Sequence, residues 1–196
     1  MSHYYSKDND LLESRPHQIQ FQINQKDYTM TSDKGVFSKA GLDFGSRVLL
    51  ETILPLEANT ILDLGCGYGP IGIVLKKENS SAQVTMVDIN PRALMLSKKN
   101  ALANYVNLEI IQSDGFENIQ ILFDAIVTNP PIRAGKKVIY VWFFEAKSHL
   151  NDNGALYIVI QKKQGALSAI KECERWYSKV LILEKKSGYY VIKCQK

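Results

Sequence analysis

The segment Asp63-Leu64-Gly65-Cys66-Gly67-Tyr68-Gly69-Pro70-Ile71-Gly72 decides the fold of this chain. It joins a short apolar stretch at residues 60–64 to helix-like sequence at residues 68–77. A buried strand that ends in glycines before a helix is the first half of a βαβ unit, and such a turn lets the backbone approach a ligand. The spacing differs from the G-x-G-x-x-G fingerprint of pyrophosphate sites, so it favours a nucleoside ligand without a pyrophosphate. We expect this pocket to be formed by Asp63, Gly65, Cys66, Gly67, Tyr68 and Gly69.

Short apolar stretches and helical stretches alternate along the rest of the chain, which predicts parallel strands joined by crossover helices. Strands are expected at residues 60–64, 83–88, 108–111, 123–128 and 155–160, and helices at residues 68–77, 90–104, 136–150 and 165–177. Asn90 is expected to open the second of these helices, with Pro91 at its first position, and a turn at residues 151–154 is expected to close the third. The last two strands, residues 180–183 and 189–194, are joined by so short a turn that they must be antiparallel. The prediction is an α/β, Rossmann-like fold of the class I methyltransferase type, with a mostly parallel seven-stranded sheet and a C-terminal antiparallel hairpin.

An N-terminal extension precedes this unit. Residues 19–23 alternate apolar and polar side chains, and residues 28–31 resume strand-like composition after a polar turn, which predicts a β-hairpin. A glycine-bearing loop then leads to Ser46, a predicted helix N-cap, and the helix is expected to end before Pro55. We therefore divide the chain into an N-terminal extension, residues 1–34, and a methyltransferase-like domain, residues 35–196.

Two acidic residues follow expected strands next to the glycine turn. Asp88 closes the second strand of the unit, where a carboxylate can accept hydrogen bonds from both hydroxyls of a ribose, and Ile89 is expected beside the adenine. Asp114, Gly115 and Phe116 follow the third strand, where a carboxylate can accept from the adenine amino group and an aromatic ring can cover the base. The alternative is that both acidic residues only form turns at the strand ends.

The motif Asn129-Pro130-Pro131-Ile132 ends the expected strand at residues 123–128. The amino group of an aromatic base is a poor nucleophile, because its lone pair is delocalised into the ring. Two acceptors, the side-chain oxygen of Asn129 and the carbonyl of Pro130, favour a pyramidal nitrogen, and the prolines preset the carbonyl direction. Asn-Pro is also common in ordinary turns, but its position at the carboxyl end of a central strand favours chemistry. The predicted catalytic residues are Asn129, Pro130 and Pro131.

These motifs resemble the small-subunit ribosomal RNA guanine 2-amino methyltransferases, and in particular their short single-domain members. The resemblance covers nearly the whole chain from Gly35 onward and rests on residues 36–39, 42–50, 65–72, 129–136 and 161–166. It implies S-adenosylmethionine as the cofactor, and ribosomal RNA or an assembling small subunit as the partner. It also implies that residues 37–46 fold over the methionine end of the cofactor and that Asn129 receives the target amine beside it. The cofactor contacts implied in that segment are Phe37, Asp43 and Ser46.

Two departures from the family pattern bear on the substrate. Ile132 stands where amine methyltransferases often have an aromatic residue that stacks on the base, so stacking is expected from elsewhere, with Phe37 as the candidate. Tyr140 stands where relatives usually have a histidine. Basic residues near the carboxyl ends of the sheet are expected to contact RNA phosphates. The predicted substrate-binding residues are Ile132, Arg133, Lys136 and Lys162, whereas Lys137 and Lys163 are interpreted as solvated.

Composition sets broader bounds. The length of 196 residues suits one α/β domain, and a formal charge of +4 helps phosphate binding only if it gathers on one face. The cysteines and histidines lack metal-ligand spacing, so no metal site is predicted. A polar N-terminal stretch and the lack of a long apolar run predict a cytoplasmic protein without a membrane span. The apolar cluster at residues 142–144 is interpreted as helix core, with a homodimer contact as the alternative.

Three other functions stay open as alternatives. Methylation of adenine or of a protein glutamine uses similar Asn-Pro-Pro turns, although those enzymes usually have an aromatic residue at the position of Ile132. A non-catalytic RNA-binding or assembly module of the same fold is expected to lack Asp63, a loop glycine, Asp88 or Asn129, and all are present. A nicotinamide-dependent oxidoreductase would need the pyrophosphate fingerprint and would leave the Asn129 motif unexplained.

Overall fold

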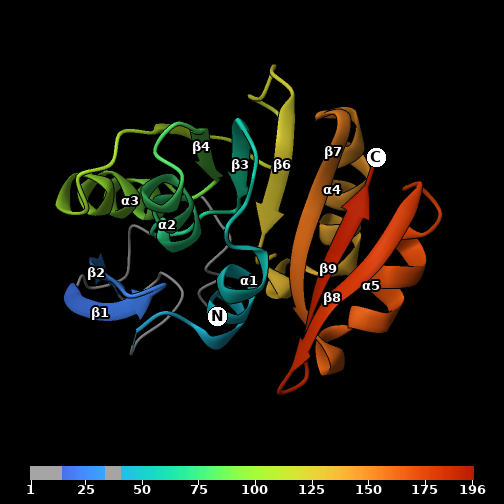
Figure 1. Ribbon diagram of the computed structural model, residues 1–196, viewed down its shortest axis with the longest axis horizontal. Coiled ribbons are helices and arrows are strands. Elements are labelled where there is room, and N and C mark those ends of the chain that lie inside the picture. Colours follow the sequence, from blue (N-terminus) through green and yellow to red (C-terminus); the bar gives the residue numbers. More distant parts are fainter. Residues whose placement is uncertain (1–14, 34–40) are drawn as a thin grey trace.

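The computed structural model describes residues 15–33 and 41–196. At its centre is a seven-stranded sheet in the order β5-β4-β3-β6-β7-β9-β8, parallel from β5 to β7 and antiparallel at β9 and β8 (Figure 1). The predicted sheet with its C-terminal hairpin is therefore confirmed. The strands are β3 Thr60–Leu64, β4 Gln83–Asp88, β5 Glu109–Gln112, β6 Phe123–Thr128, β7 Leu150–Gln161, β8 Lys179–Lys186 and β9 Tyr189–Gln195.

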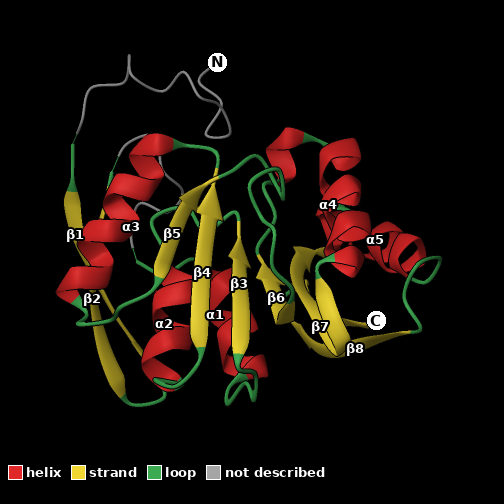
Figure 2. Cartoon of the chain, turned by 90° about the horizontal axis from the view of Figure 1, so that it is seen from above, coloured by secondary structure: helices red, strands yellow, loops and turns green. Residues whose placement is uncertain are grey.

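Helices cover both faces of the sheet and enclose two apolar cores (Figure 2). Successive strand residues point to opposite faces, so Ile61 packs in one core while Leu62 and Leu64 pack in the other. None of the helices in the described ranges is long and apolar enough to span a lipid bilayer. The helices of the first core are α1 Phe44–Ile53, α2 Pro70–Glu78 and α3 Pro91–Ala103, and those of the second are α4 Lys136–Ser148 and α5 Ala166–Cys173, with short 3-10 turns η1 Ile132–Ala134 and η2 Lys162–Gln164.

The predicted N-terminal hairpin forms a separate two-stranded sheet, β1 His17–Ile23 and β2 Lys26–Ser32, beside α3. Asn100 of α3 and Asn104, the C-cap of this helix, bind the backbone of β2. The buried Asn100 accepts from Thr31 N at 2.7 Å and donates to Thr31 O at 2.9 Å, and Asn104 donates to Thr29 O at 2.9 Å. These bonds cover an edge that would otherwise expose unpaired backbone groups. The hairpin also places Tyr28 and Met30 in the first core, and the division at residues 34 and 35 stays a prediction.

Several boundaries differ from the sequence-based expectation, and three of the differences have a clear structural description. Helix α1 starts at Phe44, because the N-cap is Asp43 rather than Ser46: the Asp43 carboxylate accepts from Ser46 N at 3.0 Å. Strand β7 starts at Leu150 and includes residues 151–154, which the sequence predicts as a turn. Helix α5 ends at Cys173, before the expected end at residue 177. By contrast, the predicted N-cap Asn90 and the first-turn proline of α3 are confirmed, since Asn90 Oδ1 accepts from Arg92 N at 3.0 Å.

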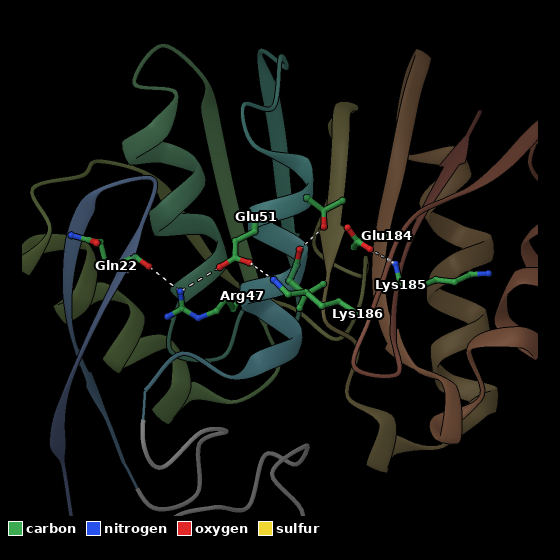
Figure 3. A network of polar contacts seen from close by, with 8 residues as sticks. Gln22, Arg47, Glu51, Glu184, Lys185 and Lys186 are labelled. Carbon is green, nitrogen blue, oxygen red and sulfur yellow. Dashed lines mark hydrogen bonds and ion pairs between the residues drawn. The ribbon is translucent and has the colours of Figure 1, made fainter.

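A surface network ties the N-terminal hairpin, α1 and the tip of the β8–β9 hairpin together (Figure 3). Arg47 donates to the carbonyl of Gln22 at 3.0 Å and pairs with Glu51 at 3.5 Å, and Glu51 pairs with Lys186 at 3.1 Å. Exposed ion pairs of this kind each contribute roughly 0–1 kcal/mol to stability. Their structural effect is to hold the start of β9 next to α1, which matters for the site described below.

Candidate active site

A cleft of about 280 Å³ opens at the carboxyl ends of β3, β4 and β6. Open α/β sheets bind ligands at this end, outside the strands and next to the loops that follow them. Most of the predicted site residues meet here. The lining is formed by Asp43, Ser46, Gly65, Cys66, Gly67, Tyr68, Pro70, Ile71, Asp88, Asn90, Ala93, Asn129, Pro130, Pro131, Ile132, Arg133, Gln164 and Tyr189.

A wider hollow of about 490 Å³ lies at the opposite edge, where β3, β4, β5 and β6 begin. Its one lining ammonium, that of Lys76, already donates to the carbonyls of Ser80 and Ala82 at 2.6 and 2.7 Å. The strand ends that bind ligands in this class of sheet are on the other side. We therefore place the functional site in the smaller cleft.

The glycine loop between β3 and α2 bonds mostly to the protein itself. Gly65 N and Cys66 N both donate to Val87 O, and Gly67 N donates to Asp88 Oδ2 at 2.8 Å. At the start of α2, Pro70 has no N–H, and Gly72 N donates to Asp63 Oδ2 at 2.8 Å. Pro70 therefore offers no donor at this helix start and the Gly72 amide is already bonded, so the start of α2 presents fewer amides to a ligand than a pyrophosphate site does.

Asp63 lies beneath this loop and does not line the cleft. Its side chain is fully buried, Oδ2 accepts from Gly72 N, and Oδ1 has no hydrogen-bond partner among the described residues. Desolvation, with a smaller contribution from the nearby carboxylate of Asp88, raises its pKa to about 7. In its ionised form this carboxylate places negative charge beneath the floor of the cleft.

Asp88 ends β4 at the edge of the cleft and is half-buried. Its two oxygens accept from Gly67 N at 2.8 Å and Asn90 N at 2.9 Å, and desolvation raises its pKa above the ordinary value. Each carboxylate oxygen can accept more than one hydrogen bond, so the group can still receive two hydroxyls of a ribose. Asp88 therefore shapes the glycine loop and faces the cleft as an acceptor.

Asn129, directly after β6, lines the cleft. Its amide nitrogen donates to Asp43 Oδ1 at 3.1 Å and to Ser46 Oγ at 3.0 Å, which links β6 to the start of α1. A carboxylate only accepts hydrogen bonds, so the group that faces Asp43 must be the amide nitrogen. No donor among the described residues occupies the amide oxygen of Asn129, which leaves that oxygen as an acceptor at the cleft.

The prolines that follow are placed as the sequence predicts. Pro130 and Pro131 line the cleft, and the carbonyl of Pro131 accepts from Ala134 N at 2.8 Å at the start of η1. Ile132 and Arg133 come from this turn and line the cleft mouth. The Asn129 amide oxygen and the backbone of Pro130 thus border the same space, as two acceptors for one amine require.

Several predicted site residues are not brought to the cleft. Phe116 is buried in the second core, and its ring stacks on His149 with centroids 4.3 Å apart, so it does not face the cleft. Phe37 lies outside the described residues. Besides Asp63, the other predicted residues that the structure does not place in the lining are Gly69, Ile89, Asp114, Gly115, Lys136 and Lys162.

Sequence reasoning missed several residues of the site, among them Tyr189, Gln164 and Trp142. Tyr189 and Gln164 line the cleft from the C-terminal half of the chain; no motif marks Tyr189, whereas Gln164 lies in the segment 161–166 that carries the family resemblance but received no predicted role. Trp142 contacts the glycine loop from α4: a Cβ at Gly65 would lie 3.1 Å from the ring carbon Cζ3. Its burial with Phe143 confirms that the cluster is largely helix core, although Phe144 is 57% exposed.

Comparisons with known proteins agree with this geometry. The family described as "Methyltransferase small domain" matches residues 27–193. The uncharacterized protein YbxB of Bacillus subtilis is 46% identical over the full length of both chains. The ribosomal RNA small subunit methyltransferase C of Haemophilus influenzae is 44% identical over 68% of this chain, which spans only 42% of that enzyme.

A solved structure has the same fold as well. The Thermus thermophilus 16S rRNA N2 G1207 methyltransferase, in complex with AdoMet and guanosine, superposes with a TM-score of 0.84 and 26% identity. The match covers 94% of this chain and 52% of that one. With the sheet order, the cleft and the Asn129 motif, these matches show that the chain belongs to the methyltransferase small domain family of S-adenosylmethionine-dependent methyltransferases.

Proposed function

We propose that this chain transfers the methyl group of S-adenosylmethionine to the exocyclic 2-amino group of a guanine in small-subunit ribosomal RNA. The observation that carries the proposal is the orientation of Asn129: Asp43 fixes the amide nitrogen, and the amide oxygen is left as an acceptor in the cleft. An amine that donates to this oxygen and to the carbonyl of Pro130 is drawn towards the pyramidal form that can attack a methyl carbon.

The cleft suits a positively charged nucleoside better than a dinucleotide. Asp88 is the acceptor for the ribose hydroxyls, the backbone of Gly65, Cys66 and Gly67 borders the ligand, and the buried Asp63 adds negative charge below it in its ionised form. S-adenosylmethionine supplies an electrophilic methyl group on a sulfonium centre. Holding the amine in line with that group is a proximity effect, and the methylated ammonium loses its proton readily without a dedicated base.

The assignment of guanine and ribosomal RNA rests on the relatives. The names of the Haemophilus influenzae and Thermus thermophilus enzymes specify small-subunit ribosomal RNA, and the second was solved with guanosine. Arg133 at the cleft mouth would supply phosphate contacts, together with the exposed Lys136 that follows it and the exposed Lys162, which shortly precedes the cleft residue Gln164. With so few base-reading groups, RNA structure is expected to provide much of the specificity.

The test is transfer of labelled methyl to small-subunit ribosomal RNA or subunits from cells lacking this protein, followed by nucleoside analysis. We expect a methylated guanine, and a loss of about 100-fold or more in kcat for Asn129→Ala, the size seen when one preorganised polar group is removed. Asn107→Ala, an exposed asparagine at the opposite hollow, is the matched control and should behave as wild type.

Each alternative has its own outcome in this assay. Cofactor binding without labelled RNA would refute the substrate assignment and make adenine or protein glutamine the next substrate to test. Lack of any cofactor binding would favour the non-catalytic RNA-binding module. Label on guanine that persists in Asn129→Ala would show that the acceptor geometry is not what drives the reaction.

A further inference from the structure

The Asn-Pro-Pro motif is not followed by an aromatic residue, but another part of the chain brings an aromatic side chain to the cleft. Tyr189 begins β9 and lines the same cleft as Asn129 and Ile132. Its ring packs against the backbone of Gly45, where a Cβ would lie 2.9 Å from ring carbon Cε1 and 3.3 Å from Cδ1. Gly45 leaves room for this ring, so the glycine and the tyrosine form one packed unit.

The position of Gly45 places the Tyr189 ring close to the amine site. Gly45 lies between Asp43 and Ser46, the two residues whose side chains hold the amide of Asn129. Tyr189 and Asn129 therefore contact the same short turn at the start of α1 from different elements. A second ring, that of the 40% exposed Phe44, lies 5.5 Å from Tyr189 at an interplanar angle of 54° and supports it from this turn.

The backbone that carries Tyr189 is held on two sides. Tyr189 pairs with Gln161 of β7 and with Lys186 of β8, and Lys162 N donates to Gly188 O at 2.7 Å. Lys186 in turn pairs with Glu51 of α1 at 3.1 Å, as Figure 3 shows. A ring on a fixed backbone loses little conformational freedom when a ligand packs on it, which suits a binding surface.

We propose that Tyr189 is the aromatic wall of the substrate subsite, and that its ring stacks on the purine whose amino group reaches Asn129. The proposal rests on the proposed function and adds the residue that recognises the plane of the base. Of the described residues that line the cleft, Ile132 supplies apolar contact only and Tyr68 is just 2% exposed, so the stacking energy comes from Tyr189. Stacking of one base on an aromatic ring corresponds to about a five- to 150-fold change in affinity.

The test compares three variants. Tyr189→Leu removes the ring but keeps an apolar side chain, Tyr189→Phe keeps the ring, and Phe144→Leu is the matched control on a different surface. We expect Tyr189→Leu to raise the KM for ribosomal RNA about five- to 150-fold while cofactor affinity stays near that of wild type. Tyr189→Phe and Phe144→Leu should keep wild-type values for both.

A second readout needs no turnover. 2-Aminopurine riboside carries the same 2-amino group, and its fluorescence falls when it stacks on an aromatic ring. With protein saturated with S-adenosylhomocysteine, we expect quenching in wild type and Tyr189→Phe and its loss in Tyr189→Leu. Equal quenching in Tyr189→Leu and wild type, or no quenching in wild type, would overturn the proposal. A loss of cofactor affinity in Tyr189→Leu as large as its loss of affinity for RNA would overturn it as well. If wild type quenches the probe but labels no RNA, the proposed RNA substrate fails while the aromatic wall stands.

Discussion

Exchange of the amide of Asn129 and the carboxylate of Asp43 offers a direct test of the site. Asn129→Asp replaces the donating amide with a carboxylate, so two carboxylates face each other across the 3.1 Å that now separates Asn129 Nδ2 from Asp43 Oδ1. Asp43→Asn keeps a good helix N-cap and removes one charge. In the double variant, the new amide at position 43 donates to the new carboxylate at position 129, which restores the pair in reverse.

The expected cost of the single change Asn129→Asp follows from the distance. With an effective dielectric constant of about 20, two unit charges at this separation repel by about 5 kcal/mol. Protonation of one carboxyl limits the loss to about 4 kcal/mol at neutral pH. Both positions are half-buried, so solvent screens part of the repulsion, and we expect the free energy of unfolding to fall by roughly 1–4 kcal/mol.

Urea unfolding of wild type, both single variants and the double variant measures the coupling between the two positions. We expect the double variant to be more stable than the sum of the single effects by at least about 1 kcal/mol. Repulsion raises the pKa of the carboxyl pair in the folded state, so the deficit of Asn129→Asp should shrink as the pH falls and grow as it rises. Additive effects within about 0.5 kcal/mol would mean that Asp43 does not orient position 129.

Three further changes test the parts around this pair. Burial raises the pKa of Asp63 to about 7 in the folded protein, above the pKa of an aspartate in the unfolded chain. The stability that the protonated Asp63 contributes is fully present below the unfolded pKa and is lost as the pH rises through 7. Relative to Asp63→Asn, the unfolding free energy of the wild-type apoprotein should fall by about 1.4 kcal/mol more between about pH 6 and pH 8, and equal slopes would contradict this. Gly72→Ala places a Cβ 2.5 Å from Met86 Sδ and should cost about 1–3 kcal/mol in urea unfolding, with partial recovery in the double variant with Met86→Val. Arg133→Ala should lower the slope of log affinity for RNA against log salt by about 0.7, whereas Lys179→Ala, an exposed lysine at the start of β8, should leave the slope unchanged.

The sequence predicts the fold well where the signals are local. Apolar runs bounded by turn residues place β3, β4 and β6 at their observed positions, and Asn90-Pro91 marks the start of α3. Prediction fails where distant contacts decide. Residues 151–154 have turn composition, yet the strand there begins at Leu150, because Leu150 pairs with Phe123 of β6. The N-cap of α1 is Asp43, whose carboxylate binds both Ser46 N and the distant Asn129.

For the candidate site, too, prediction succeeds where local spacing decides and fails where distant contacts decide. Asp88 and Asn129 meet because the carboxyl ends of parallel strands share one edge of a sheet, and this much follows from their spacing. Sequence spacing does not say which way a side chain turns once its strand is placed. Asp63 is buried below the loop and Phe116 packs on His149, whereas Tyr189 reaches the cleft from a hairpin far along the chain. These three outcomes depend on contacts between segments that are separated in the sequence.

Trp142 shows how the two halves of the site depend on each other. A Cβ at Gly65 would lie 3.1 Å from its ring, and one at Gly115 would lie 2.7 Å from Nε1, so the indole occupies space that both glycines leave free. Both glycines also have positive φ, of 74° and 55°, which a larger residue would strain. Helix α4, which carries Trp142, begins directly after the turn that follows Asn129, Pro130 and Pro131. The glycine loop of the cofactor pocket is thus packed against the helix that continues from the substrate motif, so a displacement of either segment changes the space available to the other.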